Sequence, residues 1–326
     1  MDKVSVIMVN YNGKRLLAES LTALQNQTYQ NLEIILVDNG SSDGSVEYVK
    51  DNFRSVTLIV NKKNRGFAWG NNRGIEKATG AFIATINTDA FANLDWIEEL
   101  VNPMAYNDRI GTCASKMLFY DRREVINSTG ICVSRSGAVW DRGMFEKDEG
   151  QYIRHKAVFG PCAGAALYRK SMLDEIGLFD EDFFMYMEDA DLAFRARLAG
   201  WECRYVPTAV VYHKHGLTTG VDSDFSVYHV NRNIIWNVTK NFPARLLVSS
   251  LPWIIGRNIA VIPYYMMRGQ GMAILKSKID AIRGVLWMIK KRRRPGKRGC
   301  EKDINTFIKT WAGINKPINP FKGGQV

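Results

Sequence analysis

The chain has 326 residues, of which 46% are hydrophobic and 24% are charged. This composition is typical of a folded globular protein and excludes a disordered or fibrous chain, and the length accommodates one large domain with an appendage or two small domains. The formal net charge is +11, but residues 276–302 carry eleven Lys and Arg residues against two Asp and Glu residues, and residues 1–275 are about neutral. The basic character therefore belongs to a tail, and the neutral remainder offers no wide basic surface for nucleic acid.

Cysteine usage and targeting features suggest an intracellular protein. The five cysteines include no CxxC pair, and an odd count without such a pair argues against a disulfide framework or a zinc site and indicates a reducing compartment. The N-terminal sequence MDKVSVIMVNYNG lacks the apolar region and cleavage site of a signal peptide, so we expect it to form a first strand. No segment offers about 18 uncharged apolar residues, so we expect no clear transmembrane helix.

Apolar runs and helical spacings alternate along the first 90 residues. Continuous apolar runs predict buried strands over residues 4–9, 33–37, 56–60 and 81–86. Helices are predicted over residues 16–24 and 67–78, and between them up to Val49, where Ser41, Ser42 and Asp43 offer N-cap residues. This alternation predicts parallel βαβ units in a doubly wound sheet, which binds ligands at the carboxyl ends of its strands.

Short polar loops follow each of these predicted strands. They read NYN (10–12), DNGSSDGS (38–45), NKKNRGFAWGNN (61–72) and NTDA (87–90). Such residues also form ordinary turns, but four of these loops on one edge favour recognition of a base, a ribose and phosphates. A dinucleotide fold and a P-loop are excluded, because no GxGxxG follows the first strand and no GxxxxGK[ST] occurs. Asp89 is placed either to bind a divalent cation or to cap a nearby helix.

The middle of the chain has weaker patterns. Residues 111–160 predict short strands with a flexible loop around 137–155. The segment from Gly160 to Gly164 is a turn of small residues that permits close backbone approach. We expect Ser171 to cap a short helix that follows it.

The sequence FFMYMEDADLAFRARLAG places three acids among aromatic residues and methionines. Carboxylates left without partners in such a setting cost several kcal/mol each. On a helix that begins near Met187, Glu188 and Asp191 share one side, and Asp189 points about 100° away. We expect Asp191 to pair with Arg195 at i,i+4 spacing. The alternative is that all three acids form a solvated first turn of a helix.

Six blocks, in order over roughly residues 3–240, resemble family-2 glycosyltransferases of the rhamnosyltransferase-like branch, which have the GT-A fold. They read VSVIMVNYNG, LVDNGSSDGS, NRGFAWGNNRGI, INTDA, GPCAGAALYRKSMLDEIGLFDEDFFMYMEDADLAFRARLAGW and VVYHKHG. The resemblance implies an α/β, doubly wound, mostly parallel GT-A sheet in a catalytic domain over residues 1–240. It also implies an inverting hexosyltransferase that moves a sugar from dTDP-L-rhamnose or a UDP-sugar to a hydroxyl of a lipid-linked or polysaccharide acceptor in cell-surface glycan synthesis.

The resemblance also implies roles for individual residues. The nucleotide-sugar site would comprise Val9, Tyr11, Asp38, Asn39, Asn64, Gly66, Asn72 and Asn87. Asn87 replaces the first acid of the family's DxD motif, so Asp89 would carry the charge that binds Mg²⁺ or Mn²⁺. His213 would be a second ligand of the cation or diphosphate, although a lone histidine at a strand end is also a common core residue. Asp189 would be the general base, with Glu188 binding the acceptor or serving as the second candidate for the base.

Residues 241–326 form a C-terminal extension of different character. Two apolar runs between residues 244 and 267 are split by Arg257 and contain two prolines. A stripe with three-four spacing then predicts one apolar helix face, formed by Met272, Leu275, Ile279, Ile282, Leu286 and Ile289. Lysines and arginines flank this stripe, which is typical of an amphipathic helix on an anionic membrane surface; the alternatives are a helix packed on the catalytic domain or a nucleic-acid contact. We therefore expect a cytoplasmic protein that is peripheral on the inner face of the cell membrane and does not bind nucleic acid.

Two other functions remain open at this point. A nucleotidyltransferase would share the nucleotide-binding α/β architecture, but it would need a basic phosphate-binding loop, and VNYNGKRL is a poor version of one. A non-catalytic sugar- or membrane-binding module would not need the Glu188–Asp189 pair, which is present here.

Overall fold

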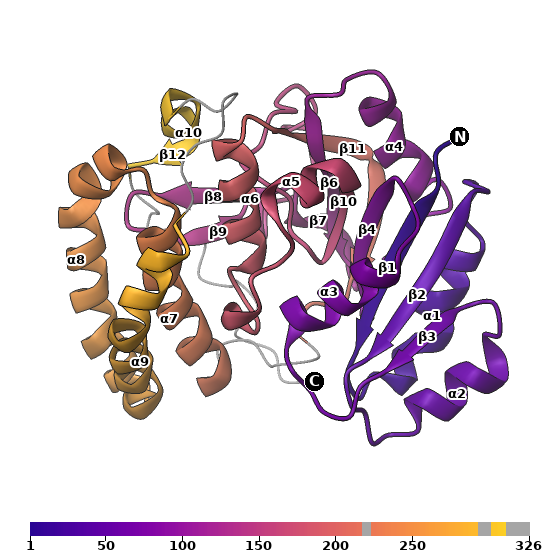
Figure 1. The fold of residues 1–326 in the computed structure, drawn as a ribbon, viewed down its shortest axis with the longest axis horizontal. Coiled ribbons are helices and arrows are strands. Elements are labelled where there is room, and N and C mark those ends of the chain that lie inside the picture. Colours follow the sequence, from indigo (N-terminus) through magenta and orange to yellow (C-terminus); the bar gives the residue numbers. More distant parts are fainter. Residues whose placement is uncertain (217–222, 293–300, 311–326) are drawn as a thin grey trace.

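The computed structural model describes residues 1–216, 223–292 and 301–310, and Figure 1 shows a central sheet with helices on its faces and a helical group beside it. The strands are β1 Val4–Asn10, β2 Leu32–Asp38, β3 Thr57–Val60, β4 Phe82–Asn87, β5 Ala90–Ala92, β6 Ile110–Phe119, β7 Arg122–Ser128, β8 Ile131–Ser134, β9 Val139–Asp141, β10 Ala165–Arg169, β11 Glu202–His213 and β12 Ile308–Lys309. The helices are α1 Lys14–Gln25, α2 Ser45–Asn52, α3 Phe67–Lys77, α4 Trp96–Ala105, α5 Lys170–Ile176, η1 Glu181–Phe183 (3₁₀), α6 Glu188–Leu198, α7 Asp224–Asn241, α8 Ala244–Met267, α9 Gly271–Lys290 and α10 Glu301–Phe307.

The main sheet has the strand order β3-β2-β1-β4-β10-β6-β11-β5, with β7 paired to β6. β1 pairs in parallel with β2 and β4, and β2 pairs in parallel with β3. In the second half, β10 is antiparallel to β4 and β6, and β5 is antiparallel to β11. The predicted α/β, doubly wound fold is confirmed, and the strands predicted in the first 90 residues form within two residues of their expected ends.

The apolar run of β1 is continuous because both faces of the strand are buried. Val6 and Met8 pack into one core with α1 and α4 residues such as Leu17 and Leu100. Ile7 lies between them in sequence and points into the opposite core, beneath α3, α5 and α6. This arrangement leaves the polar residues at the carboxyl end of the strand, beyond both cores.

Two predicted helix caps are wrong. α2 begins at Ser45, after Gly44 in the left-handed region (φ 80°), and no side chain caps it. Asp43 instead accepts hydrogen bonds from the Ser45 and Lys14 backbone N–H groups, at 3.1 and 2.9 Å. α5 begins one residue before Ser171, with Arg169 at the N-cap position and no side-chain cap. α2 follows a turn at Gly44 and α5 follows β10 directly. In both helices the N-cap position is therefore occupied by a residue other than the expected serine or aspartate.

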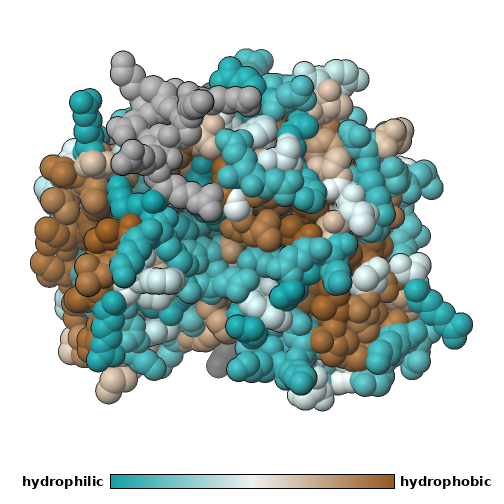
Figure 2. Space-filling view, in the orientation of Figure 1, coloured by the Kyte–Doolittle hydropathy of each residue, from teal (hydrophilic) through white to brown (hydrophobic). Residues whose placement is uncertain are grey.

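The two apolar runs after residue 243 form one helix, α8, which continues through Pro252 and Pro263. By length and composition alone, α8 is long and apolar enough to cross a membrane, and only 11% of its most apolar 18-residue window is buried in the protein. The sequence offers no run of 18 uncharged apolar residues because Arg257 interrupts it, but a window that contains this single charge still has a mean hydropathy of 1.4, which makes α8 a candidate by length and composition. Figure 2 shows the hydrophobic surface over α8, at the left edge of the molecule.

α9 packs on α7 through a face that differs from the predicted apolar stripe. Its buried residues are Ile274, Ser277, Ala281 and Met288. Gly284 allows the close approach, since a Cβ there would lie 2.6 Å from the Trp236 indole. The stripe instead faces outward, with Met272 81% exposed and Leu286 73% exposed.

Candidate active site

The carboxyl ends of β1 and β2 are joined by a network of short polar side chains. Asp38 is fully buried and accepts hydrogen bonds from Asn10 Nδ2 at 2.8 Å and from the Ser41 backbone N–H at 2.9 Å. The Asn39 side-chain amide donates to Asn64 Oδ1 at 3.0 Å and to the Gly66 carbonyl oxygen at 3.0 Å. Three residues of the predicted nucleotide-sugar site, Asp38, Asn39 and Asn64, thus lie at one edge of the sheet, where they shape the loops that follow β1, β2 and β3.

The remaining predicted donor residues have different surroundings. Tyr11 is 42% exposed beyond β1, and Val9 lies against α3, where a Cβ on Gly70 would come within 2.7 Å of it. Asn87, at the end of β4, lies beside the small-residue turn, since a Cβ on Gly164 would be 3.1 Å from its Nδ2. These positions leave the Tyr11 ring and the Asn87 amide at the carboxyl edge of the sheet.

Asn72 uses its side-chain amide within the protein. Its Nδ2 donates to the Phe179 carbonyl at 2.9 Å and to Glu181 Oε1 at 3.0 Å, and its Oδ1 accepts from the Phe179 N–H at 3.1 Å. Asn72 therefore ties α3 to the segment that precedes the three acids. A donor-binding role for Asn72 stays a prediction.

Gly66 lies in the loop after β3 and contacts the segment that precedes Glu188, Asp189 and Asp191. It has φ of 92°, and a Cβ there would lie 2.3 Å from the Phe184 carbonyl oxygen. The same carbonyl accepts a hydrogen bond from the Phe67 N–H at 2.7 Å. Only glycine fits this position without displacing the Phe184 backbone.

Asp89 and His213 lie side by side although 124 positions separate them. β5 begins directly after Asp89 and pairs with β11, so that Ala90 lies opposite His213. His213 Nε2 is 3.1 Å from Asp89 Oδ1, and His213 Nδ1 is 2.9 Å from Asn127 Oδ1. Burial would raise the pKa of Asp89, but the hydrogen bond and charge of His213 outweigh it, and the net pKa lies below the usual value.

This pair has the chemistry of two cation ligands. When His213 Nδ1 donates a hydrogen bond to Asn127 Oδ1, the lone pair on Nε2 of a neutral imidazole faces the Asp89 carboxylate. Two acceptor groups then lie side by side, and a proton or a cation between them would bind to both. Carboxylate oxygen suits both Mn²⁺ and Mg²⁺, and neutral imidazole is a common metal ligand. No group of three or more His, Cys, Asp or Glu side chains able to hold a metal occurs among the described residues, so further ligands would come from a bound diphosphate, water or an amide such as that of Asn87.

The three acids at the start of α6 have three different environments. Glu188 is buried and its Oε2 has no hydrogen-bond partner. Asp189 is half-buried and accepts hydrogen bonds from the N–H groups of Ala190 at 2.7 Å and Ala163 at 3.4 Å. Asp191 is fully buried, and the predicted pair with Arg195 is confirmed at 2.8 Å. A solvated helix turn is therefore wrong for Glu188 and Asp191.

Their pKa values diverge accordingly. Burial, followed by the charge of Asp189, raises the pKa of Glu188. Burial, followed by the charge of Asp141 on β9, raises the pKa of Asp189. For Asp191 the effect of burial is outweighed by Arg195 and Lys240, which hold its pKa well below the usual range. Groups that transfer protons in enzymes often have pKa values shifted in this way. The raised pKa values of Glu188 and Asp189 therefore agree with their expected roles, which stay predictions.

The backbone before these acids is strained and is held by hydrogen bonds from α7, which the sequence did not reveal. Phe184, Tyr186 and Met187 all have positive φ, at 63°, 67° and 71°, a conformation that costs energy for residues other than glycine. Asn233 on α7 is fully buried and donates to the carbonyls of Phe183, Met185 and Tyr186 at 2.8–3.0 Å. The only sequence signal was its place in the polar run VNRN inside a helix.

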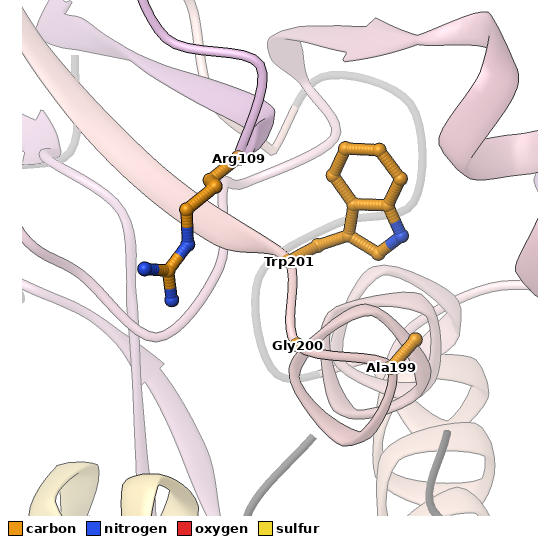
Figure 3. A pocket seen from close by; sticks show the side chains of 4 residues that line it. All are labelled: Arg109, Ala199, Gly200 and Trp201. Atoms are coloured by element: carbon orange, nitrogen blue, oxygen red, sulfur yellow. The ribbon is translucent and has the colours of Figure 1, made fainter. Parts of the chain in front are cut away.

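A hollow elsewhere on the surface is distant from these groups. It is lined by Arg109, Ala199, Gly200 and Trp201 (Figure 3). These residues lie at the C-terminal end of α6 and at the starts of β6 and β11, whereas Asp189 lies at the N-terminal end of α6. This hollow is therefore separate from the edge of the sheet where the predicted site residues meet.

A doubly wound sheet with polar side chains at its carboxyl edge and an acid pair of raised pKa is typical of an α/β enzyme that binds its ligands at that edge. Comparison with known proteins identifies the class further. Residues 5–177, more than half of the chain, match the family described as glycosyl transferase family 2. The chain belongs to this family and is a glycosyltransferase; the nucleotidyltransferase and non-catalytic alternatives are set aside.

Individual relatives support this assignment. An uncharacterized glycosyltransferase of Haemophilus influenzae is 28% identical over 241 residues, covering 71% of this chain and 69% of that protein. The N-acetylglucosaminyl-diphospho-decaprenol L-rhamnosyltransferase of Mycobacterium tuberculosis is 25% identical over 306 residues, covering 87% of this chain and 99% of that protein. A mannosyltransferase of Pyrobaculum calidifontis in complex with GDP-Man and Mn²⁺ superposes with a TM-score of 0.55 at 16% identity, covering 86% of this chain and 87% of that one. This last likeness shows the fold alone.

Proposed function

We propose that this enzyme transfers a sugar from dTDP-L-rhamnose or a UDP-sugar to a hydroxyl of a lipid-linked or polysaccharide glycan, with inversion at the anomeric carbon. The M. tuberculosis relative, matched over almost its whole length, is named for the transfer of L-rhamnose to a diphospho-decaprenol-linked sugar. This supports a lipid-linked acceptor and a place in cell-surface glycan synthesis.

The observation that carries the mechanism is the environment of Asp189. Its carboxylate lies at the N-terminus of α6, beside the Ala163 N–H, with a pKa raised first by burial and then by Asp141. In the proposed reaction Asp189 accepts the proton of the acceptor hydroxyl while that oxygen bonds to the anomeric carbon. The bond between the anomeric carbon and the diphosphate oxygen breaks at the same time, and the nucleoside diphosphate leaves. The raised pKa of Glu188 favours its protonated form, which would donate a hydrogen bond to the acceptor.

The donor would occupy the carboxyl edge of the sheet. Tyr11 and the loop of Asp38 and Asn39 would face the base and ribose, with Asn64 and Gly66 shaping the adjacent loop. Asp89 and His213 would hold a divalent cation, which would neutralise charge on the diphosphate. The Asn87 amide, beside Gly164, would contribute a further polar group to that end of the site.

The outward surface of the C-terminal helices fits a membrane. α8 exposes Val248, Ile255 and Ile259, and α9 exposes Ile282 and Leu286. Apolar faces of this extent on a monomer mark an interaction site, and the basic residues near them favour anionic lipid. We propose that the enzyme is bound at the inner face of the cell membrane, where it meets a lipid-linked acceptor.

A panel of nucleotide sugars, each with and without Mn²⁺ or Mg²⁺, tests the proposed function. A true donor binds the native state and raises the melting temperature, by mass action. Release of the nucleoside diphosphate with a lipid-linked acceptor then measures transfer. Absence of stabilisation and turnover with every dTDP- and UDP-sugar would refute the proposed donor class.

A further inference from the structure

A polar cluster lies where α7, α8 and α9 meet. Arg257 of α8 donates through Nη1 to Asn231 Oδ1 of α7, at 3.4 Å. Lys278 of α9 donates through Nζ to Asn258 Oδ1 of α8 at 2.6 Å and lies 3.5 Å from the Asn231 carbonyl oxygen. Asn231 is fully buried. Two cations from two helices therefore converge on one buried asparagine, and we call these four residues the Arg257–Lys278 cluster.

The cluster has no neutralising acid among the described residues. The three helices contain only two acids, Asp224 and Asp280. Asp280 accepts hydrogen bonds from the Tyr228 hydroxyl at 2.9 Å and from Arg283 at 3.2 Å. Asp224 accepts from the Gln270 amide at 3.1 Å. Neither acid is within ion-pair distance of Arg257 or Lys278.

Two like charges at a partly buried site oppose each other and lose hydration. The effect is visible in the pKa of Lys278, which burial and then the charge of Arg257 lower to about 7. Burial also lowers the pKa of Arg257. Neutral asparagine oxygens satisfy hydrogen bonds but do not compensate charge. An anion beside the two groups would compensate both charges.

The position of the cluster indicates which anion this is. The outward faces of the same two helices are the exposed apolar surfaces that carry Ile255, Ile259, Ile279 and Ile282. A helix lying in a membrane interface buries its apolar face about 5–10 Å into the acyl boundary, and a helix is about 10–12 Å across. The inward sides of α8 and α9 would then lie at the depth of the lipid phosphates. A guanidinium fork beside an ammonium group is a pairing that suits phosphate oxygens.

We propose that Arg257 and Lys278 bind the phosphate group of a membrane lipid, either an anionic phospholipid or the diphosphate of the lipid-linked acceptor. This inference rests on the proposed membrane location. Bound phosphate compensates both cations and anchors α8 and α9 at a defined depth in the membrane interface. It thereby also holds α7, which packs on these helices and contacts the segment before Glu188 and Asp189.

The test uses the full chain and vesicles of a neutral, phosphate-free glycolipid. One set carries phosphatidylglycerol, a second carries the same charge as oleate, and a third carries a polyprenyl diphosphate. The variants are Arg257→Gln and Lys278→Gln, and the matched control is Lys276→Gln, which removes an exposed charge two positions away on α9. Vesicle flotation measures the partition coefficient of each protein.

We expect Arg257→Gln and Lys278→Gln each to lose about tenfold or more in binding to phosphate-containing vesicles, with a much smaller loss on oleate vesicles. Lys276→Gln should lose the same factor, about fivefold, on every charged vesicle. A loss confined to the polyprenyl diphosphate set assigns the site to the acceptor, and a loss on phosphatidylglycerol as well assigns it to lipid phosphate in general. Equal losses for Lys278→Gln and Lys276→Gln on phosphate and oleate vesicles would overturn the proposal.

A second measurement separates this proposal from the membrane location. With EDTA present, inorganic pyrophosphate should raise the pKa of Lys278, followed by NMR of its ¹³C-methylated amine, whether or not the protein binds vesicles. Binding to no vesicle together with a raised pKa would refute the membrane location and support the phosphate site, whereas an unchanged pKa would refute the site. Because the substitutions remove uncompensated charge, the melting temperature of each variant without phosphate should equal or exceed that of the unmodified protein; a clear drop would give both cations a structural role and also refute the site.

Discussion

The side-chain amide of Asn233 lies 2.8 Å from the carbonyl oxygen of Tyr186, and the same amide reaches the carbonyls of Phe183 and Met185. One buried side chain thus holds three carbonyl groups of a strained segment. That segment leads directly into Glu188 and Asp189, so the position of the proposed base depends on Asn233, which lies more than 40 positions further along the chain. Strain of this kind persists only where the surroundings enforce it.

Asn233→Ala should therefore lower turnover more than it lowers donor affinity. Losing buried hydrogen bonds of this type costs about 1–3 kcal/mol. If the whole cost appears in the activation free energy, kcat falls by about 5- to 150-fold, while the donor KM should change by less than about threefold. The matched control is Asn237→Ala, one helical turn away, whose Oδ1 accepts from Asn241 at 2.7 Å and does not contact the segment. If the two variants lose stability equally and keep equal turnover, Asn233 has no positioning role.

Asp189→Asn should leave donor binding nearly intact and reduce turnover by about 10²–10⁴-fold, the usual contribution of a general base. Glu188→Gln keeps the capacity to donate a hydrogen bond and should retain more activity. Steady-state transfer and donor-induced thermal shifts measure the two effects separately. Near-normal turnover of the Asn variant would transfer the role of base to Glu188.

Stability should fall as pH rises, because Glu188 has a raised pKa. The folded protein binds this proton more tightly than the unfolded chain does, whose pKa is near 4.5. The stabilisation is thus complete below that value and is lost as pH rises through the higher folded pKa. Urea unfolding between about pH 5 and pH 8 should show a steeper decline for the unmodified protein than for Glu188→Gln. The comparison cancels contributions of other groups, and parallel curves would show that Glu188 is not protonated in the folded protein.

Asp89→Ala and His213→Ala should each abolish the additional stabilisation that Mn²⁺ or Mg²⁺ gives to donor binding, because both side chains would contact the same cation. Nucleotide-sugar titrations with and without metal, followed by melting temperature, measure this directly. Full transfer activity of the unmodified protein in EDTA would remove the cation from the reaction and leave the Asp89–His213 contact as a structural hydrogen bond.

Paired substitutions on α9 should separate its two faces. Ile282→Ser with Leu286→Ser changes residues that are 69% and 73% exposed and should weaken vesicle binding without lowering the melting temperature. Met288→Ala changes a fully buried residue and should cost about 2–5 kcal/mol of stability with little effect on the vesicle surface. The membrane role of the stripe is refuted if the double variant partitions into anionic vesicles as strongly as the unmodified protein.

Much of the fold was open to prediction from the sequence, because local periodicity reports local burial. The run around Ile7 is apolar at every position because both faces of β1 are covered, and the i,i+4 spacing of Asp191 and Arg195 was sufficient to predict their ion pair. The order of the strand-end loops and the acid pair at Glu188 and Asp189 likewise required only neighbouring residues and a family resemblance.

The tertiary structure decided the relationships between distant segments. Asp89 reaches His213 only because β5 turns back along β11, Asn233 meets Tyr186 only because α7 crosses the start of α6, and the apolar stripe of α9 faces outward because Gly284 lets the opposite face approach Trp236. A hydrophobic pattern shows that a face avoids water, but the same pattern is satisfied by a protein core or by lipid. Which of these surrounds each face depends on how the whole chain packs, and that is where Arg257 and Lys278 acquire their shared position without a neutralising acid.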